Sequence, residues 1–155
     1  ICTNLNYELV IVTNQDGLGT TSFPEETFWP AQNKMLKAFE NEGIIFDDII
    51  IDRTFESDNQ STRKPGTALL QKYMSGKYDL KNSFVIGDRL SDIQLAKNLG
   101  AKGILIGDSS NPELTDSIAL KTKEWLEIEQ FLVNQNRTFE INRKTNETNL
   151  LIVLN

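Results

Sequence analysis

The sequence predicts an α/β fold with a mainly parallel sheet that helices cover on both faces. Three observations lead to this prediction. Strand-like and helix-like segments alternate from residue 8 to residue 133, the strand-like runs are continuously apolar, and the helix-like segments carry apolar residues at helical spacing. Strands that are joined through helices pair in parallel. The 155 residues are enough to bury a core within one domain.

The expected elements follow from apolar runs and from the residues that bound them. We predict strands at residues 8–12, 46–51, 83–86 and 103–106, and helices at 24–43, 67–74, 92–100 and 122–133. Pro24 and Pro65 suit helix first turns, Ser91 or Asp92 suits a helix cap, and Gly100 suits a helix end. We expect the last helix to pack through one apolar face, formed by Trp125, Ile128, Phe131 and Leu132.

The alternation stops after residue 134. Residues 138–141 and 148–154 read as two strands with a polar connection and no helix between them. We therefore expect a first domain over 1–133, a linker at 134–136, and the beginning of a second domain over 137–155.

Composition excludes several classes of function. The formal net charge of -6 and a pI near 4.7 argue against a nucleic-acid partner, because no basic stripe is available for phosphate backbones. Cys2 is the single cysteine, which suits a reducing cytoplasm, and no apolar run approaches the roughly 20 residues that span a membrane. There is no histidine, so carboxylates, lysines and hydroxyls must carry any chemistry.

Two carboxylates stand where a buried strand is expected to give way to a helix. Gly87 lets the chain turn after the strand at 83–86, and Asp88 and Asp92 follow. Ligands bind at this edge of open α/β sheets, and carboxylate oxygen is the donor that Mg²⁺ prefers. The same pattern also fits an ordinary turn aspartate followed by a helix cap.

Two further polar segments follow strand ends. Thr13 and Asn14 come directly after the first strand, and glycines at 17 and 19 free backbone N–H groups that could hold a phosphate. Lys64 stands at a helix entrance, where its charge would offset carboxylate repulsion and bind a phosphoryl oxygen. Taken singly, the Thr13-Asn14 segment fits an ordinary polar turn equally well, and an isolated Arg63-Lys64 pair is more often a solvated surface pair.

In order along the chain, the three segments resemble the second, third and fourth motifs of the haloacid dehalogenase (HAD) phosphatase superfamily. Longer stretches are similar to the histidinol-phosphate phosphatases of that superfamily: Val12 to Thr20 with Ser22-Phe23-Pro24, Arg63-Lys64-Pro65, and Val85 to Arg89 with Asp92 to Ala96. The resemblance implies a Rossmann-like three-layer sandwich.

The tail carries a second resemblance. Arg137 to Glu140 and Arg143 to Thr148 look like the opening strands of imidazoleglycerol-phosphate dehydratase. This implies a bifunctional protein, both hydrolase and lyase, and it leaves room for an oligomer formed through the dehydratase-like domain.

Two departures from the family pattern matter. The first HAD motif, Asp-x-Asp at a strand end, provides the nucleophilic and the acid/base aspartate, and it does not occur in these 155 residues. We expect it in a strand that precedes Ile1. Relatives often hold zinc in a Cys/His loop before the lysine motif, whereas this loop offers Asp52, Thr54, Gln60 and Thr62, so we predict no zinc.

The resemblance implies Mg²⁺-dependent hydrolysis of L-histidinol phosphate to L-histidinol and phosphate, through an aspartyl phosphate, in histidine biosynthesis. It assigns the metal to Asp88, with Asp92 as a weaker ligand, and the phosphate to Thr13, Asn14, Gln15 and Lys64, with Lys64 and Thr13 as catalytic residues. Gln15, Asp16 and Arg89 are weaker candidates for contacts with the small-molecule phosphomonoester. The alternatives are another HAD phosphatase, such as the heptose bisphosphate type, or a non-catalytic HAD-fold module if a nucleophile is absent.

Overall fold

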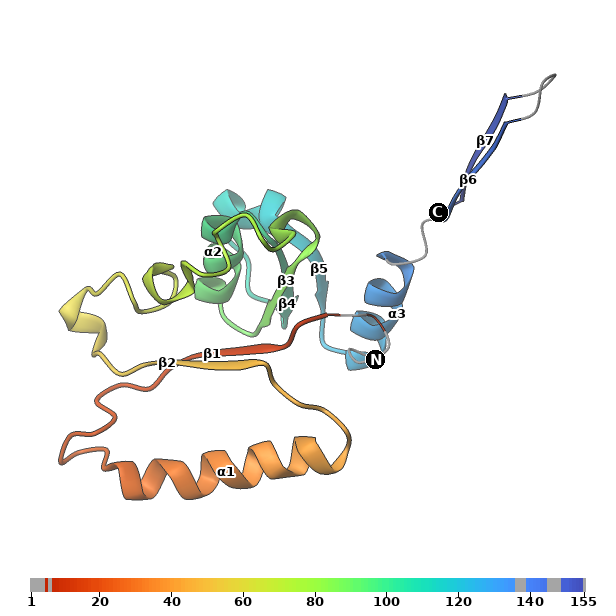
Figure 1. The fold of residues 1–155 in the computed structure, drawn as a ribbon. Coiled ribbons are helices and arrows are strands. Elements are labelled where there is room, and N and C mark those ends of the chain that lie inside the picture. The colour runs from red at the N-terminus through yellow and green to blue at the C-terminus, as the bar shows by residue number, and fades with distance from the viewer. Residues whose placement is uncertain (1–4, 6, 136–138, 145–148, 155) are drawn as a thin grey trace.

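The protein is described by a computed structural model that covers residues 5, 7–135, 139–144 and 149–154, the last two ranges by their backbone alone. Strands β1 (Val10–Asn14) and β2 (Asp48–Asp52) pair in parallel. Strands β3 (Phe84–Gly87), β4 (Lys102–Ile106) and β5 (Ile118–Thr122) form a second parallel sheet in the order β3-β4-β5. The helices are α1 (Glu25–Asn41), α2 (Leu90–Leu99) and α3 (Trp125–Gln135) (Figure 1).

Strand β4 lies at the centre of a three-layer arrangement. Its neighbouring residues Ile104 and Leu105 are fully buried on opposite faces, because side chains alternate along a strand. Leu105 packs with Ile93 of α2, and Ile104 packs with Ile128 of α3. Helices therefore cover both faces of this sheet, as its apolar strands predict, and the α/β fold is confirmed.

A third apolar cluster joins the two sheets. Leu70 and Tyr73 pack with Leu95 of α2 in a buried group. Val12 of β1 and Val85 of β3 both pack against that group, so α2 and the segment around residue 70 cover parts of both sheets. β1 and β3 are thereby held against the same apolar cluster.

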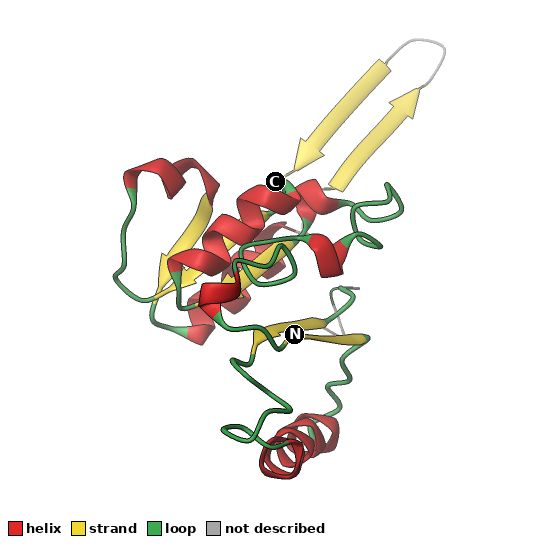
Figure 2. Cartoon of the chain, turned by 90° about the vertical axis from the view of Figure 1, so that its left-hand side faces the viewer, coloured by secondary structure: helices red, strands yellow, loops and turns green. Residues whose placement is uncertain are grey.

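Helix α1 lies on the side of β1 and β2 that faces away from α2 (Figures 1 and 2). Phe28 is buried near its beginning and makes edge-to-face contacts with Phe23 and Trp29. Phe39 contacts Phe46 in the same way near its end. Aromatic pairs thus fix both ends of the helix, in agreement with the helix predicted for residues 24–43.

The strands differ from the prediction in two respects. The parallel strands form two separate sheets in the described residues, where one was expected. Strand β5 was not predicted, although Ile118 and Leu120 alternate with more exposed residues as in a half-buried strand.

Three predictions about helices are wrong. Residues 67–74 form a short 3₁₀ helix (Ala68–Leu70) and turns, which suit the segment because residues three apart stack and bring Leu70 and Tyr73 to one side. Asp92 is not the cap of α2, because the helix already begins at Leu90 with Arg89 before it. Trp125 is 66% exposed, whereas Ile128 and Leu132 of α3 are buried.

The tail contains the two expected strands. β6 (Phe139–Lys144) and β7 (Asn149–Leu154) pair antiparallel, with Phe139 opposite Leu154. Residue 136 of the predicted linker lies outside the described residues, and the division into domains stays a prediction. Among the described residues, no helix is both long and apolar enough to cross a membrane.

Candidate active site

The carboxyl end of β1 is tied to the Lys64 segment by the side chain of Asn14. The Lys64 backbone N–H donates to Asn14 Oδ1 at 3.0 Å, and Asn14 Nδ2 donates to the Lys64 carbonyl oxygen at 3.3 Å. Both ends of one amide thus pair with both backbone groups of one residue. Two segments 50 residues apart in sequence are held side by side.

The Lys64 side chain reaches from this point to the first turn of α2. Its ammonium nitrogen lies 2.9 Å from Asp92 Oδ1, and the two side chains are 19% and 8% exposed. The second carboxylate oxygen, Asp92 Oδ2, accepts the backbone N–H of Arg89 at 3.2 Å. Asp92 therefore stabilises the beginning of α2 and fixes the lysine charge at the carboxyl end of the sheets.

Gly87 makes room for the Asp92 carboxylate. A Cβ atom at residue 87 would lie 2.2 Å from Asp92 Oδ2, closer than any side-chain contact allows. The glycine at the end of β3 is thus required by close approach of the carboxylate, and the position of Asp92 depends on it.

We expect Gly87→Ala to lower the stability of the protein by about 1–3 kcal/mol, because the added methyl group displaces the Asp92 carboxylate. The measurement is urea unfolding of the full-length protein. A Gly87→Ala protein as stable as the wild type would contradict this assignment.

Asp88 follows Gly87 and differs from Asp92 in its surroundings. Its side chain is exposed, and no hydrogen bond or ion pair engages it within the described residues. No group of three potential metal ligands is present in the described part of the chain. Asp88 is therefore the carboxylate that remains available, whereas Lys64 and the Arg89 N–H already occupy Asp92.

The hydroxyl of Thr13 is oriented by its neighbour. Gln15 Nε2 donates to Thr13 Oγ1 at 2.9 Å, which leaves the hydroxyl proton free to be donated elsewhere. The Gln15 N–H bonds to the Asp52 carbonyl on β2 at 2.7 Å. Since successive N–H groups of a strand point to opposite edges, the Asn14 N–H points away from β2. Thr13 and Asn14 thus offer two donors for an anion.

The loop that follows β1 is joined to the loop that follows β2 by an ion pair. Arg63 makes a bidentate pair with Asp16, at 2.6 and 3.2 Å, and also donates to the Thr54 carbonyl at 2.9 Å. The hydrogen bonds to the Asp16 carboxylate hold the pKa of Arg63 above its usual range. The ring of Phe55 fills the space at Gly17, where a Cβ would lie 2.4 Å from the ring.

Asp52 at the end of β2 stabilises the loop that follows this strand. Burial raises the pKa of this carboxyl, but hydrogen bonds from Thr54 and Thr62 outweigh burial, so its pKa lies below the ordinary 3.8. The Thr54 hydroxyl donates to Asp52 Oδ1 at 2.6 Å and the Thr54 N–H at 3.0 Å. Of the residues weighed as zinc ligands, Thr54 and Thr62 are therefore bonded to Asp52. Gln60 is exposed and donates to the Asp58 carbonyl oxygen instead.

Because the pKa of Asp52 is lower in the folded protein, its ionised form stabilises the fold above pH 3.8, and this contribution is lost as the pH falls further. We expect Asp52→Asn to cost about 1 kcal/mol at pH 6 and progressively less near pH 3. Urea midpoints of both proteins across this range measure the effect. A deficit that stays constant with pH would contradict the role of the charge.

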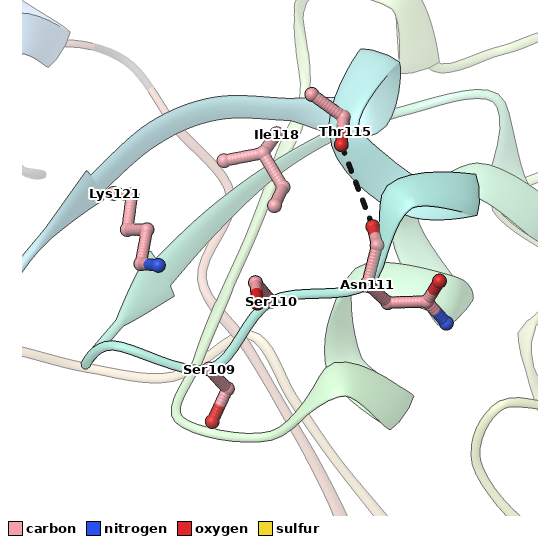
Figure 3. Close-up of a pocket in the computed structure, with 6 residues that line it drawn as sticks. All are labelled: Ser109, Ser110, Asn111, Thr115, Ile118 and Lys121. Carbon is pink, nitrogen blue, oxygen red and sulfur yellow. Dashed lines mark hydrogen bonds between the residues drawn. The ribbon is translucent and has the colours of Figure 1, made fainter.

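A small pocket of about 270 Å³ lies beside the loop that leaves β4. Ser109, Ser110 and Lys121 line it, and Asn111 and Thr115 are joined there by a hydrogen bond (Figure 3). None of the predicted site residues lines this pocket, so it is not the candidate site.

Of the predicted site residues, the structure brings Asn14, Lys64 and Asp92 into one chain of hydrogen bonds. Thr13 and Gln15 bond to each other, and Asp88 stands alone on the loop after β3. Sequence reasoning missed Asn98, whose Nδ2 donates to the Pro65 carbonyl at 2.8 Å. No sequence signal distinguishes it from a solvated helix residue.

The sequence model of the HAD-hydrolase-like family matches residues 61–123, which contain Lys64, Asp88 and Asp92. Over this segment the chain is similar to HAD-like hydrolases.

The chain is similar over its full length to two curated relatives, each named histidine biosynthesis bifunctional protein HisB. It is 52% identical to that of Bacteroides fragilis and 50% identical to that of Spirosoma linguale. It covers 43% and 44% of their lengths, so the chain spans less than half of these relatives.

Among solved HAD-like folds, the chain is similar to the D,D-heptose 1,7-bisphosphate phosphatase of B. bronchiseptica, whose crystal structure contains magnesium and phosphate. The TM-score is 0.67 at 24% identity, and the match covers 86% of this chain and 78% of the other. This likeness confirms the fold class.

Proposed function

We propose that the protein hydrolyses L-histidinol phosphate to L-histidinol and phosphate in histidine biosynthesis. The observation that carries the proposal is the hydrogen-bonded chain Asn14–Lys64–Asp92 at the carboxyl ends of β1 and β3, in a sequence about half identical to HisB proteins. This chain fixes the Lys64 ammonium group at Asp92 and ties the Lys64 backbone to Asn14, which follows Thr13 at the end of β1. A phosphoryl group requires donors of this kind.

In the proposed reaction, an aspartate carboxylate attacks phosphorus while the ester oxygen leaves with the substrate alcohol. A second aspartate protonates that oxygen and then activates the water that cleaves the aspartyl phosphate, releasing inorganic phosphate. Lys64, the Thr13 hydroxyl and the Asn14 N–H hold phosphoryl oxygens. Gln15 orients the Thr13 hydroxyl for that bond.

The proposal places the two reacting aspartates in a further segment of the protein, because Asp-x-Asp does not occur in these residues. The fold offers a position for such a strand. Among the described strands, β1 pairs only with β2, and β3 pairs only with β4, so each has one edge without a partner. All five residues of β1 are only half buried, although four are aliphatic or β-branched. A strand between β1 and β3 would cover them and end beside Lys64.

The exposed carboxylate of Asp88 fits one ligand of Mg²⁺, which proteins often hold through one or two carboxylates, substrate oxygens and water. When bound, the ion would reduce the negative charge of phosphate and nucleophile. Asp92 fits less well, since its oxygens are already bonded. In this proposal it positions Lys64 and the turn that presents Asp88.

The test is phosphate release by the purified full-length protein, first stripped of metal with a chelator. We expect turnover of L-histidinol phosphate only after Mg²⁺ is restored. Turnover of a heptose bisphosphate alone would retain the phosphatase activity and overturn the proposed substrate. No turnover of either compound would favour a non-catalytic HAD-fold module.

We further propose a cytoplasmic protein whose remaining part carries imidazoleglycerol-phosphate dehydration and any oligomer contacts.

A further inference from the structure

We propose that the side chains of Asn14 and Asn98 are positioning residues that hold the Lys64-Pro65 segment from two directions. This inference rests on the proposed phosphatase function and refines the role that the sequence implied for Asn14.

The side-chain amide of Asn14 forms two hydrogen bonds with the backbone of Lys64. Its oxygen accepts the Lys64 N–H at 3.0 Å, and its nitrogen donates to the Lys64 carbonyl at 3.3 Å. An amide offers two N–H donors and one carbonyl oxygen, and here the oxygen and one N–H are bonded to the Lys64 backbone. Turning it toward a phosphate would leave two partly buried backbone groups unpaired, which is costly. The backbone N–H of Asn14 is separate and remains open for phosphate.

The side chain of Asn98 bonds to Pro65, the next residue of the same segment. Asn98 Nδ2 donates to the Pro65 carbonyl at 2.8 Å, and Gln94 Nε2 donates to Asn98 Oδ1 at 2.8 Å, one helical turn away on α2. The Asn98 side chain is therefore oriented by Gln94. Asn14 from β1 and Asn98 from α2 thus bond to consecutive peptide groups.

Helix α2 also binds the ammonium group of Lys64. Lys64 Nζ bonds to Asp92, six residues before Asn98 on the same helix. Helix α2 therefore binds both the ammonium group of Lys64 and the backbone of the next residue. Asn14 ties the Lys64 backbone to β1. A shift of about 1 Å in a catalytic group can cost a hundredfold in rate. Loss of either asparagine should therefore act through Lys64.

A double-mutant cycle in the full-length protein tests this. We expect Asn14→Ala to lower kcat for L-histidinol phosphate by 10- to 100-fold, and Asn98→Leu by 3- to 10-fold, with less change in KM. In a Lys64→Met/Asp92→Asn background, which removes both charges of the buried pair, neither substitution should lower kcat further, because the group that they position is absent. Asn33→Ala, an exposed amide on α1, is the control and should leave kcat unchanged in both backgrounds.

The outcomes separate the two proposals. If the wild-type protein does not release phosphate, the proposed function fails before the cycle begins. If it does, and Asn14→Ala lowers kcat equally with and without Lys64, then Asn14 acts on the substrate directly or on the fold generally, and positioning is overturned. Should Asn14→Ala not fold, Asn98→Leu in the wild-type and Lys64→Met/Asp92→Asn backgrounds decides the question, because Asn98 is exposed.

Discussion

Replacing Asp88 by asparagine is expected to lower kcat/KM for L-histidinol phosphate by about a thousandfold at saturating Mg²⁺. Asp88 is the exposed carboxylate on the loop after β3, and no other group in the described residues engages it. The amide keeps the shape of the side chain but removes the charge that would hold the ion. Phosphate release as a function of Mg²⁺ concentration measures the effect, and the half-saturating concentration should rise as well.

The matched control for this variant is Asp116→Asn, an exposed aspartate in the 3₁₀ helix Pro112–Ser117. It changes the net charge equally and should retain full activity. Unchanged Mg²⁺ dependence in Asp88→Asn would show that the ion is held elsewhere. Equal losses in both variants would point to overall charge instead of a ligand.

Replacing Lys64 by methionine is expected to lower both stability and activity. It leaves the Asp92 carboxylate, whose side chain is 8% exposed, without its cationic partner, and removing one partner of a buried pair typically costs about 3–5 kcal/mol. Loss of a charged donor to the phosphoryl group should lower kcat/KM by a further 100- to 1000-fold. Urea unfolding and steady-state kinetics of the full-length protein measure the two effects.

The double variant Lys64→Met/Asp92→Asn separates stability from chemistry. Asparagine carries no charge that needs a partner and can still accept the Arg89 N–H, so most of the stability should return. Activity should stay low, since the ammonium is still missing. Recovery of activity together with stability would mean that Lys64 acts only through the fold.

Much of the fold was predictable because apolar runs and helix spacing report burial directly. The apolar residues of β3 and β4 and the helix end at Gly100 were read correctly from pattern. Residues 67–74 were not, since the preference for a 3₁₀ turn arises from the joint burial of Leu70 and Tyr73 beside α2. Trp125 has the right spacing for the α3 face, but it stands at the first residue of the helix and remains exposed.

Residue types at strand ends predicted the members of the candidate site, but not which groups bond to which. The bonds from Asn14 to the Lys64 backbone and from Asn98 to Pro65 depend on how a loop is folded between two elements. Side-chain amides bond equally well to backbone, water or ligand, so the sequence cannot choose among these partners. The roles proposed for Thr13, Asn14, Gln15, Lys64, Asp88 and Asp92 remain predictions for kinetics to test.

The Asn14–Lys64–Asp92 chain joins segments that are 50 and 28 residues apart in sequence. Closing loops of this length costs conformational entropy, and no one of the three segments contains the anion-binding arrangement by itself. The arrangement therefore exists only while the two sheets are docked. A phosphate ester that binds the docked form alone would shift the equilibrium toward it by mass action. Substrate concentration would then help to determine how much of the protein is folded.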